Sequence, residues 1–181
     1  MKKLLIGFVV IVVVGAGVLY YLNNRNRTLS PPGNAELKVG DLSVSIPYSR
    51  PSVRGRVIFG TQEEGALQPY GKYWRLGANE PTQISFSKDV TFNGETVKAG
   101  TYRIYTIPGK DSFEIRLNSE IGMWGASEPD YSKDILKAKI PVQETDTITE
   151  QFTIRMNETT DGMDIIIEWA NVRLVMPVVA Q

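Results

Sequence analysis

An uncharged run of 19 residues near the N-terminus, Leu4 to Leu22, most constrains what this chain can fold into. In a helix that rises about 1.5 Å per residue, such a run spans about 28 Å, which matches the hydrocarbon thickness of a bilayer. Tyr20 and Tyr21 stand at its end, where aromatic residues are enriched at the membrane interface, and polar residues 23–27 follow. The run predicts one transmembrane helix that anchors the chain in a lipid bilayer.

A secretory signal peptide, removed after export, is the alternative interpretation of this run. The apolar part of such a peptide is typically about 7–15 residues long and ends in small residues. Here the small residues 15–17 are followed by five more apolar or aromatic positions, so an uncleaved anchor is favoured over a body secreted after cleavage. Lys2, Lys3 and the terminal amine outnumber Arg25 and Arg27, which predicts a single-pass membrane protein with its N-terminus inside and its body outside the cytoplasm.

Charge is divided unevenly along the 181 residues. The chain holds 20 basic and 20 acidic groups, but residues 1–27 carry four basic groups and no acid. The body is therefore mildly acidic, with an excess of 4 acidic groups, which argues against a nucleic-acid partner.

Histidine and cysteine are both absent. Their absence excludes Ser-His-Asp and Cys-His catalysis, His- or Cys-ligated metals, iron–sulfur clusters and disulfides. We therefore expect no cofactor and no metal site. The chemistry left to the chain is that of carboxylates, lysine, tyrosine, serine and threonine, or binding without catalysis.

Beyond residue 36, apolar and polar residues alternate with period two, as in half-buried strands. The alternation is clearest over residues 42–46, 84–87, 113–117 and 152–156. Turn residues that suit hairpins separate other runs, at Asn93-Gly94, residues 108–111 and Asp161-Gly162. These patterns predict nine or ten strands in an all-β, antiparallel sandwich, jelly-roll-like or immunoglobulin-like. One short helical turn within residues 131–139 leads into a strand.

Three regions follow from these patterns. Residues 1–27 are expected to form the membrane anchor with its basic flanks. Residues 28–36 contain two prolines and a glycine, and are expected to form a linker. Residues 37–181 are expected to form the β-sandwich domain, whose oligomeric state the sequence does not predict.

Basic side chains gather between the first strands of this domain. Within 26 positions lie Arg50, Arg54, Arg56, Lys72 and Arg75. If residues 53–59 form a strand, Arg54, Arg56 and Ile58 share one face and Val57 and Phe59 the other. Guanidinium groups bind carboxylate or phosphate in a bidentate manner, which suggests a pocket for an anionic or polyhydroxylated ligand. The candidate ligand-binding residues are Arg50, Arg56, Tyr73, Arg75, Asn79, Glu80 and Trp124.

A structural interpretation of the same residues is favoured. Arginine stems often cover apolar surface while the charges pair with acids, here Glu63, Glu64 or Glu80. Trp74 and Trp169 are likewise expected to pack in the core or at its rim. Trp124 is the best candidate for an exposed aromatic ring, since it lies in a glycine-rich loop.

Several blocks in this region resemble a known family. The blocks are Tyr48-Ser49-Arg50-Pro51, Gly55 to Gly60, Pro69 to Thr82, Ala99 to Tyr102 and Trp124-Gly125. Over residues 44–177 the chain resembles a bacterial family of exported, uncharacterised proteins, the domain of unknown function numbered twenty-nine eleven. The resemblance implies export and an all-β body, and it supplies no activity, substrate or catalytic residue.

Two classes of function are consistent with the sequence. The leading one is a membrane-anchored, envelope-exposed module for ligand binding or interaction. The alternative is a carboxylate-based, glycosidase-like hydrolase outside the cytoplasmic membrane, with Glu80 and either Glu63 or Glu64 about 5–10 Å apart across a cleft. No catalytic residue is assigned.

Overall fold

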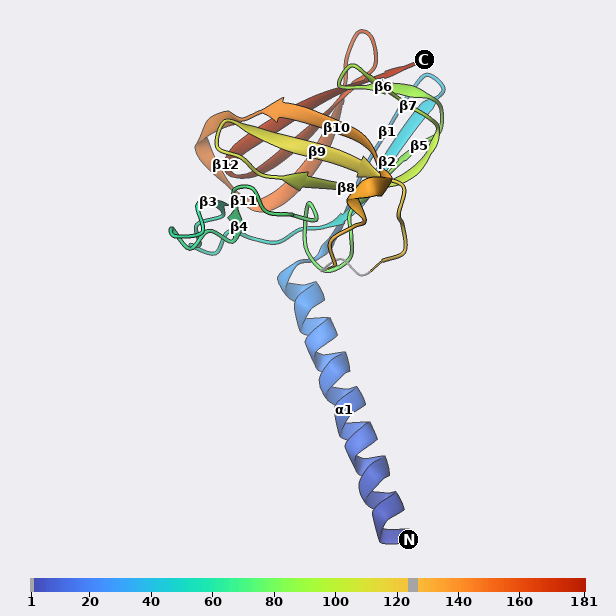
Figure 1. The fold of residues 1–181 in the computed structure, drawn as a ribbon, viewed down its shortest axis with the longest axis vertical. Coiled ribbons are helices and arrows are strands. Elements are labelled where there is room, and N and C mark those ends of the chain that lie inside the picture. Colours follow the sequence, from blue (N-terminus) through green and yellow to red (C-terminus); the bar gives the residue numbers. More distant parts are fainter. Residues whose placement is uncertain (1, 124–126) are drawn as a thin grey trace.

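The computed structural model describes residues 2–123 and 127–181, with side chains from residue 6 onward, so that Trp124 lies outside the described residues. The chain begins with helix α1 (Lys2–Leu29), which projects from a β-rich body (Figure 1). Its apolar stretch, with a mean hydropathy of 2.2, is exposed along its length, so the body does not cover it. A long apolar N-terminal helix is thereby confirmed, of the kind that serves as a signal anchor or as a signal peptide.

The expected linker is largely structured. α1 continues two turns past Leu22, and only Ser30 and Pro31 separate it from strand β1 (Pro32–Val39). Residues 28–36 are therefore shared between the end of the helix and the first half of a strand. The strand forms here because Ala35 alternates into the core, and Gly40 (φ +57°) turns the chain back toward the next strand.

Two antiparallel sheets form the body in a sandwich-like arrangement (Figure 1). The larger sheet has the strand order β1, β2 (Leu42–Ser49), β5 (Gln83–Phe86), β8 (Gly100–Ile107), β9 (Ser112–Asn118) and β10 (Asp134–Pro141). The smaller has the order β11 (Gln143–Glu158), β12 (Met163–Ala180), β6 (Val90–Phe92) and β7 (Glu95–Val97). A short parallel pair, β3 (Phe59–Gly60) and β4 (Gln68–Pro69), brings the described strands to twelve, against the nine or ten expected.

The three expected hairpins are confirmed. Asn93-Gly94 joins β6 to β7, residues 108–111 join β8 to β9, and Asp161-Gly162 joins β11 to β12. A 3₁₀ turn, Tyr131–Lys133, leads into β10 as expected. The alternating apolar side chains of both sheets point inward and form one shared core.

Strand β12 folds back on itself. Gly162 lies directly before its start, yet a Cβ on Gly162 would fall 2.2 Å from the carbonyl oxygen of Val178, near the end of the strand. Sixteen residues of straight strand would separate these positions by about 50 Å, so the chain must reverse between them. The reversal is at Ala170, whose φ of +53° is uncommon for a residue other than glycine.

An aromatic cluster fills the end of the core nearest α1. Its members are Phe59, Trp74, Phe113, Phe152 and Trp169. Trp74 and Trp169 stack with ring centroids 5.5 Å apart and are 2% and 1% exposed, which confirms that both are core residues. The indole of Trp74 donates to the carbonyl of Gly77 at 3.2 Å.

Candidate functional site

A cavity of about 320 Å³ lies where α1 meets the body. The end of α1 and Ser30 supply one part of its wall, residues 51–56 a second, residues 67–79 a third, and Trp169 of β12 a fourth. Its polar lining residues are Asn26, Ser30, Ser52, Arg54, Arg56, Gln68, Tyr73, Arg75 and Asn79. Four of the seven sequence-predicted ligand residues, Arg56, Tyr73, Arg75 and Asn79, therefore line one cavity.

The segment that carries Arg54 and Arg56 is a turn, so the expected strand over residues 53–59 is wrong. Arg54 (φ +51°) and Gly55 (φ +67°) are consecutive residues in the left-handed region, which no strand tolerates. The turn carries Arg56 back over the preceding residues, where Nε donates to the carbonyl of Val53 at 3.1 Å and Nη2 to that of Ser52 at 2.6 Å. As a result Ile58 is buried and Val57 is half exposed, while Phe59 packs against the core, so the predicted division into two faces does not hold.

Arg75 and Asn79 are held by a tight loop. Leu76 (φ +53°) and Asn79 (φ +59°) both take left-handed conformations, and Leu76 is fully buried. Arg75 Nη1 donates to the carbonyl of Asn79 at 3.1 Å, and Asn79 Nδ2 donates to the carbonyl of Ser30 at 3.3 Å. This loop thereby connects an arginine of the cavity to the end of the helix.

The arginines of this cavity have no acidic partners. No carboxylate lines it, and within the described parts of the chain neither Arg54, Arg56 nor Arg75 forms an ion pair. Glu150 contacts the turn through its carboxylate, which accepts from the backbone nitrogen of Arg54 at 3.0 Å. Residues 1 and 124–126 carry no carboxylate side chain. The expected pairing with glutamates is therefore wrong, and among the described residues the hydrogen-bond acceptors of these guanidinium groups are backbone carbonyls.

The glutamates named for that pairing have other positions. Glu80 pairs with Arg27 of α1, and Glu64 accepts from the backbone nitrogen of Thr61 at 2.7 Å. Glu80 and Glu64 line two different cavities, neither of which is the arginine cavity, and Glu63 lies exposed on the surface. The hydrolase alternative requires two carboxylates that face one another across a single cleft, and these carboxylates do not.

Arg50 connects strands rather than lining the cavity. Its Nη2 donates to Thr153 Oγ1 at 3.2 Å and its Nε to the carbonyl of Phe152 at 3.4 Å. Its backbone nitrogen donates to the carbonyl of Pro31 at 2.9 Å. The residue therefore joins β1, β2 and β11, and it is structural.

Two further groups at the cavity were missed by the sequence reasoning. Trp169 is 1% exposed, and its indole nitrogen has no hydrogen-bond partner among the residues described. Arg103, also 1% exposed, donates through Nη2 to the hydroxyl of Tyr73 and, at 2.5 Å, to the carbonyl of Ser127.

Arg103 lies directly behind a lining residue, since its Cζ is 5.4 Å from the ring centroid of Tyr73. Its Nε and Nη1 have no partner in the described part of the chain, and none of the ion pairs there includes it. A buried charge without a counter-charge is costly. Arg103 is therefore a further guanidinium group close to the cavity, in contact with it through Tyr73.

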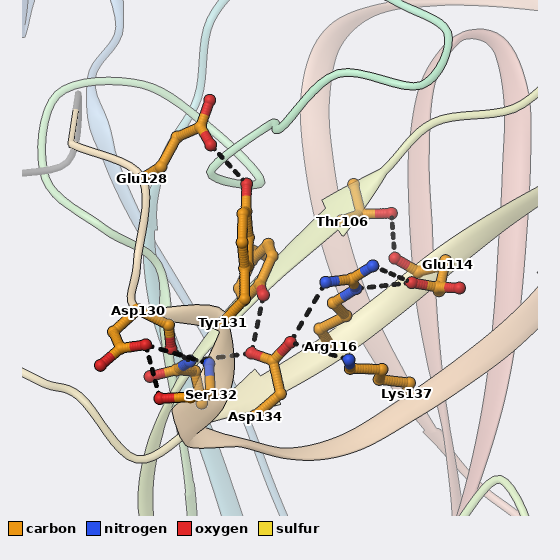
Figure 2. Close-up of polar contacts among 11 residues, drawn as sticks. Thr106, Glu114, Arg116, Glu128, Asp130, Tyr131, Ser132, Asp134 and Lys137 are labelled. Atoms are coloured by element: carbon orange, nitrogen blue, oxygen red, sulfur yellow. Dashed lines mark hydrogen bonds and ion pairs between the residues drawn. The ribbon is translucent and has the colours of Figure 1, made fainter.

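A second polar cluster lies on the outer face of β8, β9 and β10 (Figure 2). The side chain of Asp134 is 1% exposed and accepts from Tyr105 Oη at 2.7 Å, Asn118 Nδ2 at 2.8 Å and Arg116 Nη1 at 3.2 Å. Lys137 Nζ lies 3.7 Å from the same carboxylate. Both carboxylate oxygens are engaged by neighbouring side chains, which supports a structural role for this cluster.

The tyrosines of this cluster are held in the neutral form. Burial raises the pKa of Tyr105 above its usual range, and the hydrogen bond to Asp134 raises it further. Burial, together with the hydrogen bond to Glu128, raises the pKa of Tyr131 to about 12. Arg116 packs over both rings, 5.3 Å from the Tyr131 centroid and 6.0 Å from that of Tyr105. Both tyrosines are therefore hydrogen-bond donors at neutral pH.

The fold and the cavity together define a class: an antiparallel β domain that follows an apolar N-terminal helix and carries an arginine-lined cavity at their junction. The chain belongs to the family described as Protein of unknown function (DUF2911), whose match covers residues 30–178. This confirms the family membership expected from the sequence blocks. The match begins directly after α1 ends, so the helix lies outside it. No curated protein and no solved structure matches the chain.

Proposed function

We propose that this protein is a membrane-anchored domain that binds an anionic ligand in the arginine cavity. The observation that carries the proposal is the lining: three guanidinium groups and no carboxylate. Arg54 and Arg56 are exposed and Arg75 is half-buried, so all three positive charges are open to a ligand from solvent. Like charges gathered in one recess repel one another, and an anion that pairs with them offsets that repulsion. Arginine also offers the planar donor geometry that phosphate and carboxylate groups accept.

The size and the remaining lining narrow the ligand class. A volume of about 320 Å³ is at the small end of ligand sites, which suits one phosphate or carboxylate group with a short attached moiety. Asn79 and the hydroxyl of Tyr73 add neutral polar groups, while Trp169 contributes an indole N–H that lacks a partner within the described residues. The proposed ligand is therefore a small anion with additional hydrogen-bonding atoms.

Anion binding is testable with inorganic phosphate and succinate as probes. We expect calorimetric titration of the full chain in neutral detergent micelles, at low salt, to detect binding of at least one of them. Hydrogen bonds to charged groups contribute about 1.5–3 kcal/mol each. Arg56→Gln and Arg75→Gln should therefore each weaken binding about tenfold or more, and the double variant should abolish it.

The matched control is Arg155→Gln, because Arg155 is an exposed arginine that pairs with Glu168, outside the cavity. This variant should bind as the unmodified chain does. The proposal would be contradicted if neither phosphate nor succinate bound. It would also be contradicted if Arg155→Gln weakened binding as much as Arg56→Gln or Arg75→Gln does.

The proposal includes α1 as an uncleaved anchor, with the body outside the cytoplasm. Contacts between the end of the helix and the body support retention of the helix. Arg27 pairs with Glu80, Arg54 Nη2 donates to the carbonyl of Leu29 at 3.1 Å, and Asn26 lines the cavity. Removal of the helix would open one wall of the site.

Anchoring predicts that the full-length chain remains in the membrane pellet after an alkaline carbonate wash, with its N-terminal residues intact by mass spectrometry. Added protease should digest the body from the outer side of intact cells. A mature protein in the soluble fraction that starts near Gly17 or later would show that α1 is a cleaved signal.

A further inference from the structure

The distance of the arginine cavity from the apolar run of α1 limits which ligands can enter the cavity. The run ends at Leu22, and the helix continues without a break to Leu29. With a rise of about 1.5 Å per residue, Asn26 and Leu29 lie about 6 Å and 10 Å beyond Leu22 along the axis. Both residues line the cavity.

These heights coincide with the headgroup layer of a bilayer. The hydrocarbon core is about 30 Å thick, and the headgroup regions bring the total to about 40–45 Å, or about 5–7 Å on each side. Tyr20 and Tyr21 mark the interface below, where aromatic rings settle. The cavity therefore opens at the level of lipid phosphates, or directly above it.

The mouth of the cavity has an apolar side as well as a charged one. Leu29 and Leu67 line it, and Leu67 is 39% exposed. Exposed aliphatic side chains beside arginines suit a ligand that carries a charged head on an apolar body. A free inorganic anion has no apolar part that these side chains could contact.

We propose that the arginine cavity binds the phosphate headgroup of an anionic phospholipid from the bilayer that holds α1. This inference rests on the proposed anion site and names the class and the source of its ligand. In the bound state Arg54, Arg56 and Arg75 surround the phosphate, and Leu67 contacts the glycerol region.

The test compares the thermal unfolding midpoint of the full chain in phosphatidylcholine vesicles with and without phosphatidylglycerol. A ligand that binds only the folded state raises this midpoint. We expect a rise of several degrees with phosphatidylglycerol, its loss in the Arg56→Gln, Arg75→Gln double variant, and its retention in Arg155→Gln.

A second variant separates lipid from free anion. Seven neutral helix-forming residues inserted between Asn24 and Arg25 lift the cavity by about 10 Å and turn it by almost two full turns, so that its direction is nearly unchanged. This chain should still respond to inorganic phosphate and should no longer respond to phosphatidylglycerol.

The outcomes are distinguishable. A response to phosphate without a response to phosphatidylglycerol overturns the lipid assignment and leaves the anion site in place. A response to neither overturns both. A response to phosphatidylglycerol that survives the double substitution places the lipid elsewhere, on residues such as Arg25 and Arg27, and also overturns the assignment.

Discussion

Replacing Asp134 with alanine is expected to lower the free energy of unfolding of the body by about 3–5 kcal/mol, the usual effect of removing one partner from a buried ion pair. The substitution leaves Tyr105, Asn118 and Arg116 without their shared acceptor. Because the Asp134 side chain is 1% exposed, water does not readily replace it. Asn118 keeps its bond to the carbonyl of Asp130 and Arg116 its pair with Glu114, while the buried hydroxyl of Tyr105 loses its acceptor.

Urea unfolding followed by tryptophan fluorescence measures this effect. Asp134→Asn keeps one acceptor oxygen and should fall between the alanine variant and the unmodified chain. Asp41→Ala is the matched control, since Asp41 also pairs with a lysine, at 2.9 Å, but its side chain is 85% exposed. Exposed pairs contribute about 0–1 kcal/mol. Equal losses for Asp134→Ala and Asp41→Ala would show that the cluster does not hold the sheet together.

Gly162→Ala is the second substitution with a large expected effect, a loss of about 3 kcal/mol from overpacking. The added Cβ would fall 2.2 Å from the carbonyl oxygen of Val178 and 3.0 Å from Cα of Val179. Both are backbone atoms, so no side chain can rotate away. Relief requires the two arms of β12 to separate, which also strains the pairing of Val178 with Phe92 of β6.

Asp161→Ala serves as the control for the turn, because Asp161 is exposed and the change adds no atom near Val178. It should alter stability by about 0.5 kcal/mol or less. Should Gly162→Ala unfold at the same urea concentration as Asp161→Ala, the close approach of the two arms would be wrong.

The strands and hairpins of the body were predictable from local chemistry. Period-two alternation in β2, β9 and the second half of β11 reports directly which face is buried, and Asn93-Gly94 specifies its turn. The reversal within β12 was not predictable in this way. Ala170 carries no signal for a left-handed conformation, which only the pairing around it imposes.

The alternation around Arg54 predicted a strand where the structure has a turn, and the reason is physical. Residues 53–59 alternate as a strand would, but tertiary contacts of Val53 and Ile58 with the core hold the chain in a turn. The burial of Arg103 and of the Asp134 side chain has no counterpart in the local pattern of the sequence. The loop between β9 and β10 covers them, and a local pattern carries no information about such a cover.

Four residues that line the candidate cavity could be recognised from the sequence, but the contacts that their side chains make could not. Arg56, Tyr73, Arg75 and Asn79 were recognised because guanidinium and amide groups cluster in the sequence. Arg50 belonged to the same cluster, but its side chain reaches β11, about a hundred positions away in the chain. Which arginine reaches the cavity depends on that long-range packing.

With α1 as the proposed anchor, the outer strand β10 has a consequence for how copies of this protein meet. Outer strands present unpaired backbone groups that invite a strand from a neighbouring molecule, and lysines or prolines along them discourage it. In β10, Lys137 and Lys139 are exposed at alternate positions, and Pro141, which lacks an N–H, closes the strand. Anchored proteins meet often because they diffuse in two dimensions. Charge repulsion along this edge would keep such encounters from ending in shared sheets and aggregation.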